Sequence, residues 1–137
     1  MDAKFITMEE RKVSELKYHS DTAPGVRFLA IDCNLFDRAP IYCAVRKVNK
    51  VSRKQVDYVD FHRHKVDSVY LFIGDKKDLK GLKAIVKIED KEFTIESPLT
   101  VFIPKDLEHS YKLINGSGTF ISLLMSGNYN ESTYSDE

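Results

Sequence analysis

Short apolar runs separated by turn residues are the main pattern of this chain from Val26 onward. The clearest run covers 82–88, where apolar residues alternate mostly with lysine, and this period of two indicates a strand with one buried face. Similar β-branched or aromatic runs predict further strands. These expected strands cover residues 26–33, 41–48, 58–64, 69–73, 93–95, 100–103, 110–114 and 119–125. About nine short strands in one domain predict an all-β sandwich or barrel.

The two ends of the chain show a different pattern. Met8–Tyr18 carries a thin apolar stripe in a charged segment, so a short N-terminal helix is expected there. The last residues are polar and are expected to form a loosely attached tail. We therefore divide the chain into an N-terminal arm or short helix (1–25), a β-barrel (26–127) and a polar C-terminal tail (128–137).

Composition and charge narrow the class of protein further. The 137 residues suffice for one compact domain, and 42% hydrophobic with 31% charged residues is typical of a globular protein. The 21 basic residues balance the 21 acidic ones, so nucleic acid is not expected as a partner. The first residues contain no apolar stretch that resembles a signal peptide or a membrane span, so we expect a cytoplasmic protein with no membrane partner. Cys33 and Cys43 are expected to be reduced core residues.

Two histidines in one expected strand are the first candidate site. His62 and His64 lie two residues apart, so their side chains project from the same face of a strand, about 7 Å apart. Both imidazoles can then reach one ion, although by itself such a pair is more often a chance pair or two hydrogen-bonded core histidines than a metal site. A second element runs from Pro104 to His109, where one expected strand ends, the chain turns and the next strand begins with a histidine.

Together the two elements resemble the motifs of the cupin superfamily. His62, His64 and Gly74 match the first motif, in which His-x-His precedes an acidic or glutamine ligand and then a glycine. Pro104 and His109 match the second motif, Pro-x-Gly-x-x-His. The resemblance covers roughly 58–125 and implies a cupin-type jelly-roll barrel, the double-stranded β-helix. It also implies that the three histidines bind one divalent Fe, Mn, Ni, Zn or Cu ion, and imidazole suits all of these metals.

The fourth ligand depends on how the first motif is counted. Counting back from Gly74 selects Asp67, whereas counting forward from His64 selects Asp67 only if the loop is one residue short, and otherwise Ser68. We favour Asp67 because a carboxylate lowers the charge of the site and suits hard or borderline cations. The alternative is a loop carboxylate that accepts hydrogen bonds within the turn, and the cation would then keep its charge for a carboxylate-bearing metabolite. In the second motif Asp106 replaces the glycine, and aspartate tolerates unusual turn dihedrals.

Counting residues that share a strand face predicts the walls of the pocket. From His109 it places Tyr111 inward, and from Asp67 it places Val69 and Leu71 inward. Tyr111 is the candidate catalytic residue, as a proton donor or an orienting hydroxyl, and its alternative role is that of a core tyrosine.

These expectations lead to two classes of function. The first is a small metalloenzyme of oxygenase, isomerase or lyase type, in which the cation keeps open positions for a small polar metabolite. The second is a non-catalytic cupin that binds or senses a small molecule and supports a partner enzyme, because the fold does not decide between them. A homodimer is expected because cupins commonly pair through their sheets and residues 1–25 can add a strand to a neighbour. His19 lies outside both motifs and is expected to be exposed and without a role.

Overall fold

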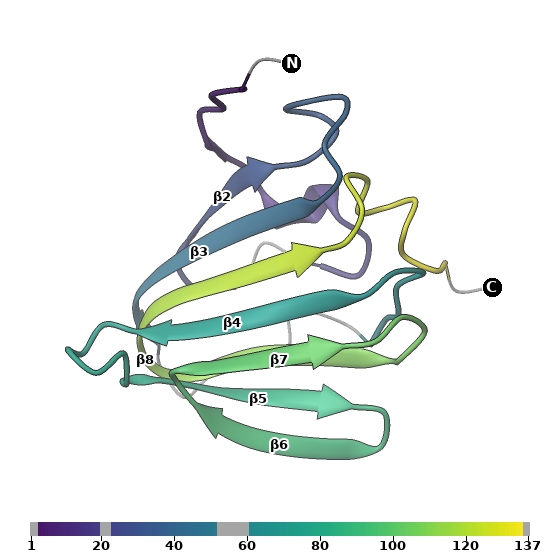
Figure 1. The fold of residues 1–137 in the computed structure, drawn as a ribbon. Coiled ribbons are helices and arrows are strands. Elements are labelled where there is room, and N and C mark those ends of the chain that lie inside the picture. The colour runs from purple at the N-terminus through teal and green to yellow at the C-terminus, as the bar shows by residue number, and fades with distance from the viewer. Residues whose placement is uncertain (1–2, 20–22, 52–60, 136–137) are drawn as a thin grey trace.

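The computed structural model describes residues 3–19, 23–51 and 61–135, and it is built almost entirely of antiparallel strands (Figure 1). A single 3-10 turn, Val13–Glu15, is the one helical element in these ranges. The strands are β1 (Glu9–Glu10), β2 (Val26–Ile31), β3 (Tyr42–Val51), β4 (Ser68–Gly74), β5 (Leu82–Ile88), β6 (Lys91–Glu96), β7 (Leu99–Ile103) and β8 (His109–Leu124). The sequence therefore predicted the fold class and most of the strands.

The long strand β8 joins the two parts of the sheet. Its first half pairs with β5, which in turn pairs with β6, and its second half lies between β3 and β4 in the order β1-β2-β3-β8-β4-β7. The change of partners falls at Gly116, whose φ is +94°, and a Cβ there would lie 1.8 Å from the carbonyl oxygen of Gly81. Only glycine fits this left-handed position next to another backbone. The two strands expected at 110–114 and 119–125 are consequently one continuous strand.

The predicted N-terminal helix at Met8–Tyr18 is wrong. Glu9 and Glu10 pair with β2 as the short strand β1, and the 3-10 turn follows. Only Val13 and Leu16 place apolar side chains in the core from this segment. Two buried residues are too few to hold the broad apolar face that an amphipathic helix needs, so the backbone pairs with the edge of the sheet instead.

The direction of the side chains in β4 also differs from the prediction. Ser68, Tyr70 and Phe72 face the interior, whereas Val69 and Leu71 are only half-buried on the opposite face. The prediction counted from Asp67, but Asp67 belongs to the turn before β4 and does not share the strand's alternation. Because the side-chain period of a strand is two, an error of one residue reverses every side chain.

The C-terminal segment is polar, as predicted, but it packs against the barrel. Tyr129 and Thr133 are 6% and 1% exposed, and Tyr129 belongs to the core cluster that contains Leu29 and Leu124. Figure 1 shows the described part of this segment folding back beside the ends of the strands. Residues 128–135 therefore pack onto the barrel through the buried side chains of Tyr129, Ser132 and Thr133.

The two cysteines are free thiols, and both are half-buried. Burial raises the pKa of Cys33 and of Cys43.

In the described part of the chain, no helix has the length and apolar character needed to cross a membrane.

Candidate metal centre

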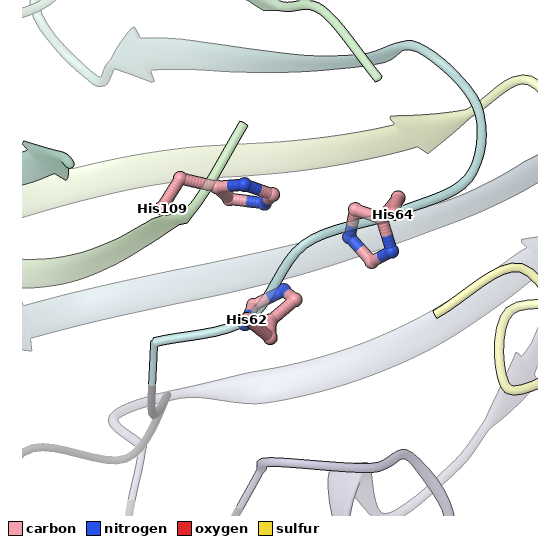
Figure 2. Close-up of side chains that lie close together, drawn as sticks. All are labelled: His62, His64 and His109. Atoms are coloured by element: carbon pink, nitrogen blue, oxygen red, sulfur yellow. The ribbon is translucent and has the colours of Figure 1, made fainter. Parts of the chain in front are cut away.

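The structure brings the three predicted histidines together in the interior (Figure 2). His62, His64 and His109 each offer a ring nitrogen, and these nitrogens all lie within 4.8 Å of one another. The ring centroids are 4.6 Å apart for His62 and His109, 4.8 Å for His62 and His64, and 5.1 Å for His64 and His109. Their exposed fractions are 4%, 3% and 0%. Three imidazoles can therefore reach one ion.

Backbone pairing holds the cluster in place. His109 is the first residue of β8, and it exchanges two backbone hydrogen bonds with His62, at 3.2 and 2.9 Å. The chain before β4 thus runs antiparallel to the start of β8, although His62 and His64 form isolated bridges rather than a strand. Of the strand expected at 58–64, residues 58–60 lie outside the described residues. The carbonyl of His64 also accepts a hydrogen bond from the amide of Asp106, at 2.7 Å.

Hydrogen bonding sets the tautomer of His109. Its Nδ1 lies 2.8 Å from the carbonyl oxygen of Leu107, and because a carbonyl only accepts, Nδ1 carries the proton. The lone pair of the neutral ring is then on Nε2, which is buried and has no hydrogen-bond partner among the described residues. Such a buried, unsatisfied acceptor costs about 1–3 kcal/mol. A metal ion at this position would satisfy it, so the residues present fit a bound cation.

The tautomer of His64 follows from the C-terminal segment. The hydroxyl of Thr133 donates to the carbonyl oxygen of Tyr129 at 2.6 Å, and therefore accepts from Nδ1 of His64 at 2.8 Å. This arrangement leaves the lone pair of His64 on Nε2. Ring nitrogens that are held in this way by a second partner are typical of histidine metal ligands.

Burial keeps these imidazoles neutral, which is the form that binds a metal. Loss of solvation lowers the pKa of His64 to about 2 and that of His109 to about 4. The nearby ring of His62 is the second cause of both of these shifts. Near neutral pH a cation would therefore displace few protons from the two rings.

The structure does not bring Asp67 into the cluster. Its carboxylate accepts a hydrogen bond from the amide of Lys105 at 2.9 Å, which is the turn role that the sequence left open. Ser68, the alternative ligand, faces the interior with 2% exposure, and its hydroxyl has no partner among the described residues. The described ligand group thus consists of three imidazoles and no carboxylate, so a cation bound by these neutral ligands would keep its full charge.

We expect Asp67→Ala to change metal affinity by less than about threefold, because its carboxylate serves the turn rather than the centre. The same substitution should lower the free energy of unfolding by about 1 kcal/mol through loss of that hydrogen bond. Competition with a chromogenic chelator measures the affinity, and urea titration measures the stability. Ser68→Ala is the matched control, and a loss of affinity of tenfold or more for Asp67→Ala alone would restore Asp67 as a ligand.

Tyr111 faces inward, as predicted, but it occupies a core position. Its ring stacks on Phe120 with centroids 4.2 Å apart, and its hydroxyl is hydrogen-bonded to the side chain of Arg46. The ring of Tyr70 lies near both Tyr111 and the histidine cluster. Its centroid is 5.1 Å from that of Tyr111 and 5.8 Å from that of His109. This surrounding matches the core alternative, and a catalytic role for Tyr111 stays a prediction.

Besides Thr133, the sequence motifs missed two residues next to the cluster, Tyr129 and His19. The hydroxyl of Tyr129 lies 3.2 Å from Nε2 of His62 and 3.4 Å from Nε2 of His19. The prediction that His19 is exposed is wrong, because the residue is half-buried and its ring lies 5.4 Å from that of His62. Burial lowers the pKa of His19 to about 3. Neither residue belongs to a motif. The one signal in the sequence was an aromatic residue in the polar stretch that ends the chain.

Removing the hydroxyl of Thr133 should weaken metal binding about 10- to 100-fold, the range for partners that orient a metal ligand. Thr133→Val keeps the size of the side chain but leaves Nδ1 of His64 without its acceptor. Thr133→Ser retains the hydroxyl and should bind the metal nearly as well as the wild type. Equal affinities for the Val and Ser variants, measured by calorimetric titration, would contradict this role.

Comparisons with known proteins agree with this geometry at the level of the fold. No family model and no curated protein matches the sequence. Among solved structures, a variant of oxalate decarboxylase from Bacillus subtilis aligns over 98% of this chain, with a TM-score of 0.55 and 16% identity. A protein from Planctomyces limnophilus aligns over 93% of this chain and 96% of its own, with a TM-score of 0.56 and 12% identity. This chain spans about a third (34%) of the decarboxylase chain.

A jelly-roll barrel with a buried three-histidine cluster is the class that the fold and the site define. Within that class, the chain has the cupin fold, as its two motifs predicted. Mn(II) centres have been described in the same B. subtilis decarboxylase. The three histidines of this chain could hold a metal ion, and the donor set does not select which one.

Proposed function

We propose that this protein is a small metal-dependent enzyme that acts on a small polar metabolite in the barrel. The observation that carries the proposal is the buried Nε2 of His109, which has no partner among the described residues although its ring belongs to a cluster with two other imidazoles. A divalent cation held there would have three neutral protein ligands and open positions for substrate. Mn, Fe, Ni, Zn and Cu are the candidates.

The bound ion would act as a Lewis acid toward an oxygen atom of the substrate. The chain's own residues perform the other tasks. Leu107 and Thr133 fix the ring nitrogens of His109 and His64, and the buried rings of Tyr70 and Tyr129 lie against the cluster. Burial raises the pKa of Tyr129 well above its usual value, so its hydroxyl keeps its proton and can donate a hydrogen bond beside His62.

A turnover screen tests the proposal. The protein is loaded with each of the five metals in turn and incubated with small hydroxy, keto and dicarboxylic acids, oxalate included, while NMR follows substrate and product. We expect metal-dependent conversion of at least one acid and none with His109→Ala. If the loaded protein binds an acid but converts none with any metal, the protein is instead a non-catalytic small-molecule binder.

We also propose a homodimer. The edge strands β6 and β7 carry large exposed apolar side chains, with Phe93, Leu99 and Phe102 at 48%, 38% and 60% exposure. Edge strands with exposed apolar side chains favour pairing with another chain. Light scattering should give twice the chain mass at micromolar concentration, and Phe102→Lys should shift the mass toward the monomer. A monomer mass for the wild type across that range would contradict the proposal.

A further inference from the structure

Two arginines face each other inside the barrel wall. Arg27 in β2 and Arg46 in β3 are directly opposite partners in the antiparallel pair, and both point inward with 5% and 6% exposure. Directly opposite side chains have Cβ atoms about 5 Å apart, and like charges in such a pair are destabilising. Buried charges are normally paired. This arrangement therefore needs compensating negative charge.

The described residues compensate only one of the two charges. Arg27 forms an ion pair with Glu15 at 3.1 Å and donates to the hydroxyl of Tyr42 at 2.8 Å. Arg46 donates a hydrogen bond to the carbonyl oxygen of Pro24 at 3.1 Å and another to the hydroxyl of Tyr111. None of the ion pairs in the described ranges includes Arg46. Among the residues that the structure describes, the buried charge of Arg46 thus has only neutral hydrogen-bond acceptors.

A small cavity lies at this pair of arginines. It provides about 20 Å³ of space for water-sized groups, and its wall contains both guanidinium-bearing residues together with Tyr42, Tyr111, Tyr129 and His19. About 10–15 Å³ of such space holds one water molecule, so the occupant must be small or must enter by one end. Tyr129 lines this cavity and also contacts His62, so the cavity adjoins the histidine cluster.

We propose that the cavity binds the carboxylate of the metabolite, with Arg46 as its anchor and Arg27 as the second positive charge. A planar guanidinium matches a carboxylate with two parallel hydrogen bonds. The phenolic hydroxyl of Tyr111 beside Arg46 adds a polar contact at the same wall. That this carboxylate belongs to the substrate rests on the proposed function, whereas the anion site itself rests on the two arginines.

Formate is the probe, because it is the smallest carboxylate. At 100 mM, a dissociation constant of about 1 mM would shift the folding equilibrium roughly 100-fold and raise the Tm by several degrees. We expect this shift in metal-free protein, and its loss in Arg46→Met, which removes the charge with similar length. Lys47→Met is the matched control, since Lys47 is the next residue of β3 and its side chain is 50% exposed. It should respond as the wild type does.

Further variants keep the test decisive. If Arg46→Met does not fold, Arg46→Lys should fold and bind formate about 10-fold more weakly, because the two-point contact is lost. Asp21, outside the described residues, is replaced by Asn to test whether the chain supplies its own carboxylate. Stabilisation by formate that is equal in Arg46→Met and wild type, or that appears only in Asp21→Asn, overturns the inference. A formate response without metal binding would refute the proposed function alone, and metal binding without a formate response would refute the anion site alone.

Discussion

His109→Ala should lose more than 100-fold in metal affinity, the largest effect that we expect from a single substitution at the centre. The ring is fully buried, and its Nε2 lone pair faces the other two imidazoles. Losing one of three ligands should exceed the 10- to 100-fold losses known for the groups that merely orient ligands. Elemental analysis should find about one metal ion per wild-type chain, and the variant should purify without metal.

Stability provides a second measurement of the same effect. A ligand at 1,000 times its dissociation constant stabilises the folded state by about 4 kcal/mol, so a chelator should lower the Tm of the wild type and leave that of His109→Ala unchanged. His19→Ala is the matched control, because it removes a nearby imidazole outside the three-histidine group. A wild-type Tm that does not respond to any of the five metals or to the chelator would show that these histidines do not form a metal centre.

Acid should destabilise the metal-free protein well before its carboxylates titrate. In the folded chain the pKa of His64 is about 2 and that of His109 about 4, both below the value of about 6.5 for an unfolded chain. Between these values the unfolded state binds more protons, so stability falls as pH falls. From pH 7 to pH 5 these two histidines should each cost about 2 kcal/mol, and His19, whose pKa burial lowers to about 3, should add a similar amount. That is a large part of the 5–15 kcal/mol that stabilises a typical domain.

Urea titrations of the metal-free protein at pH 7, 6 and 5 test this dependence. His109→Gln removes one of three rings with a lowered pKa, the others being those of His64 and His19, so its loss of stability over the same range should be about a third smaller. Bound metal should shift the loss to lower pH, because the ion competes with protons for the same lone pairs. Equal stability of the metal-free wild type at pH 7 and pH 5 would show that the rings titrate in the folded state as they do in the unfolded chain.

The fold could be predicted because strand alternation and turn residues are local signals. Leu82–Ile88 was placed correctly, since its apolar residues alternate with Lys83 and Lys87 and only Ile85 departs from the pattern. The N-terminal segment failed for the opposite reason: its few apolar residues are compatible with a helix or with an edge strand, and only the backbone of β2 decides between them. The junction at Gly116 required knowledge of its neighbour Gly81, which no local pattern contains.

The site was predictable where its residues belong to motifs. The two motifs contain His62, His64 and His109, and the structure brings these three residues together. The contributions of Thr133 and Tyr129 were not predictable, because the hydrogen bond of Thr133 to His64 spans 69 residues and depends on how a polar segment packs. The two ways of counting the first motif differ by one residue, so the spacing does not decide whether Asp67 lies at the centre or in the turn.

The long sequence separation between the parts of the centre bears on the order of folding and metal uptake. In an unfolded chain only His62 and His64 remain near each other, so an ion could be held there by two imidazoles at most. The imidazole of His109 reaches the other two only when the start of β8 pairs with the segment before β4. The hydrogen bond between His64 and Thr133 joins residues that are 69 positions apart. Such distant contacts form late in proteins dominated by non-local strand pairing. Tight metal capture therefore has to follow closure of the barrel, and an ion added during refolding would slow unfolding rather than speed folding.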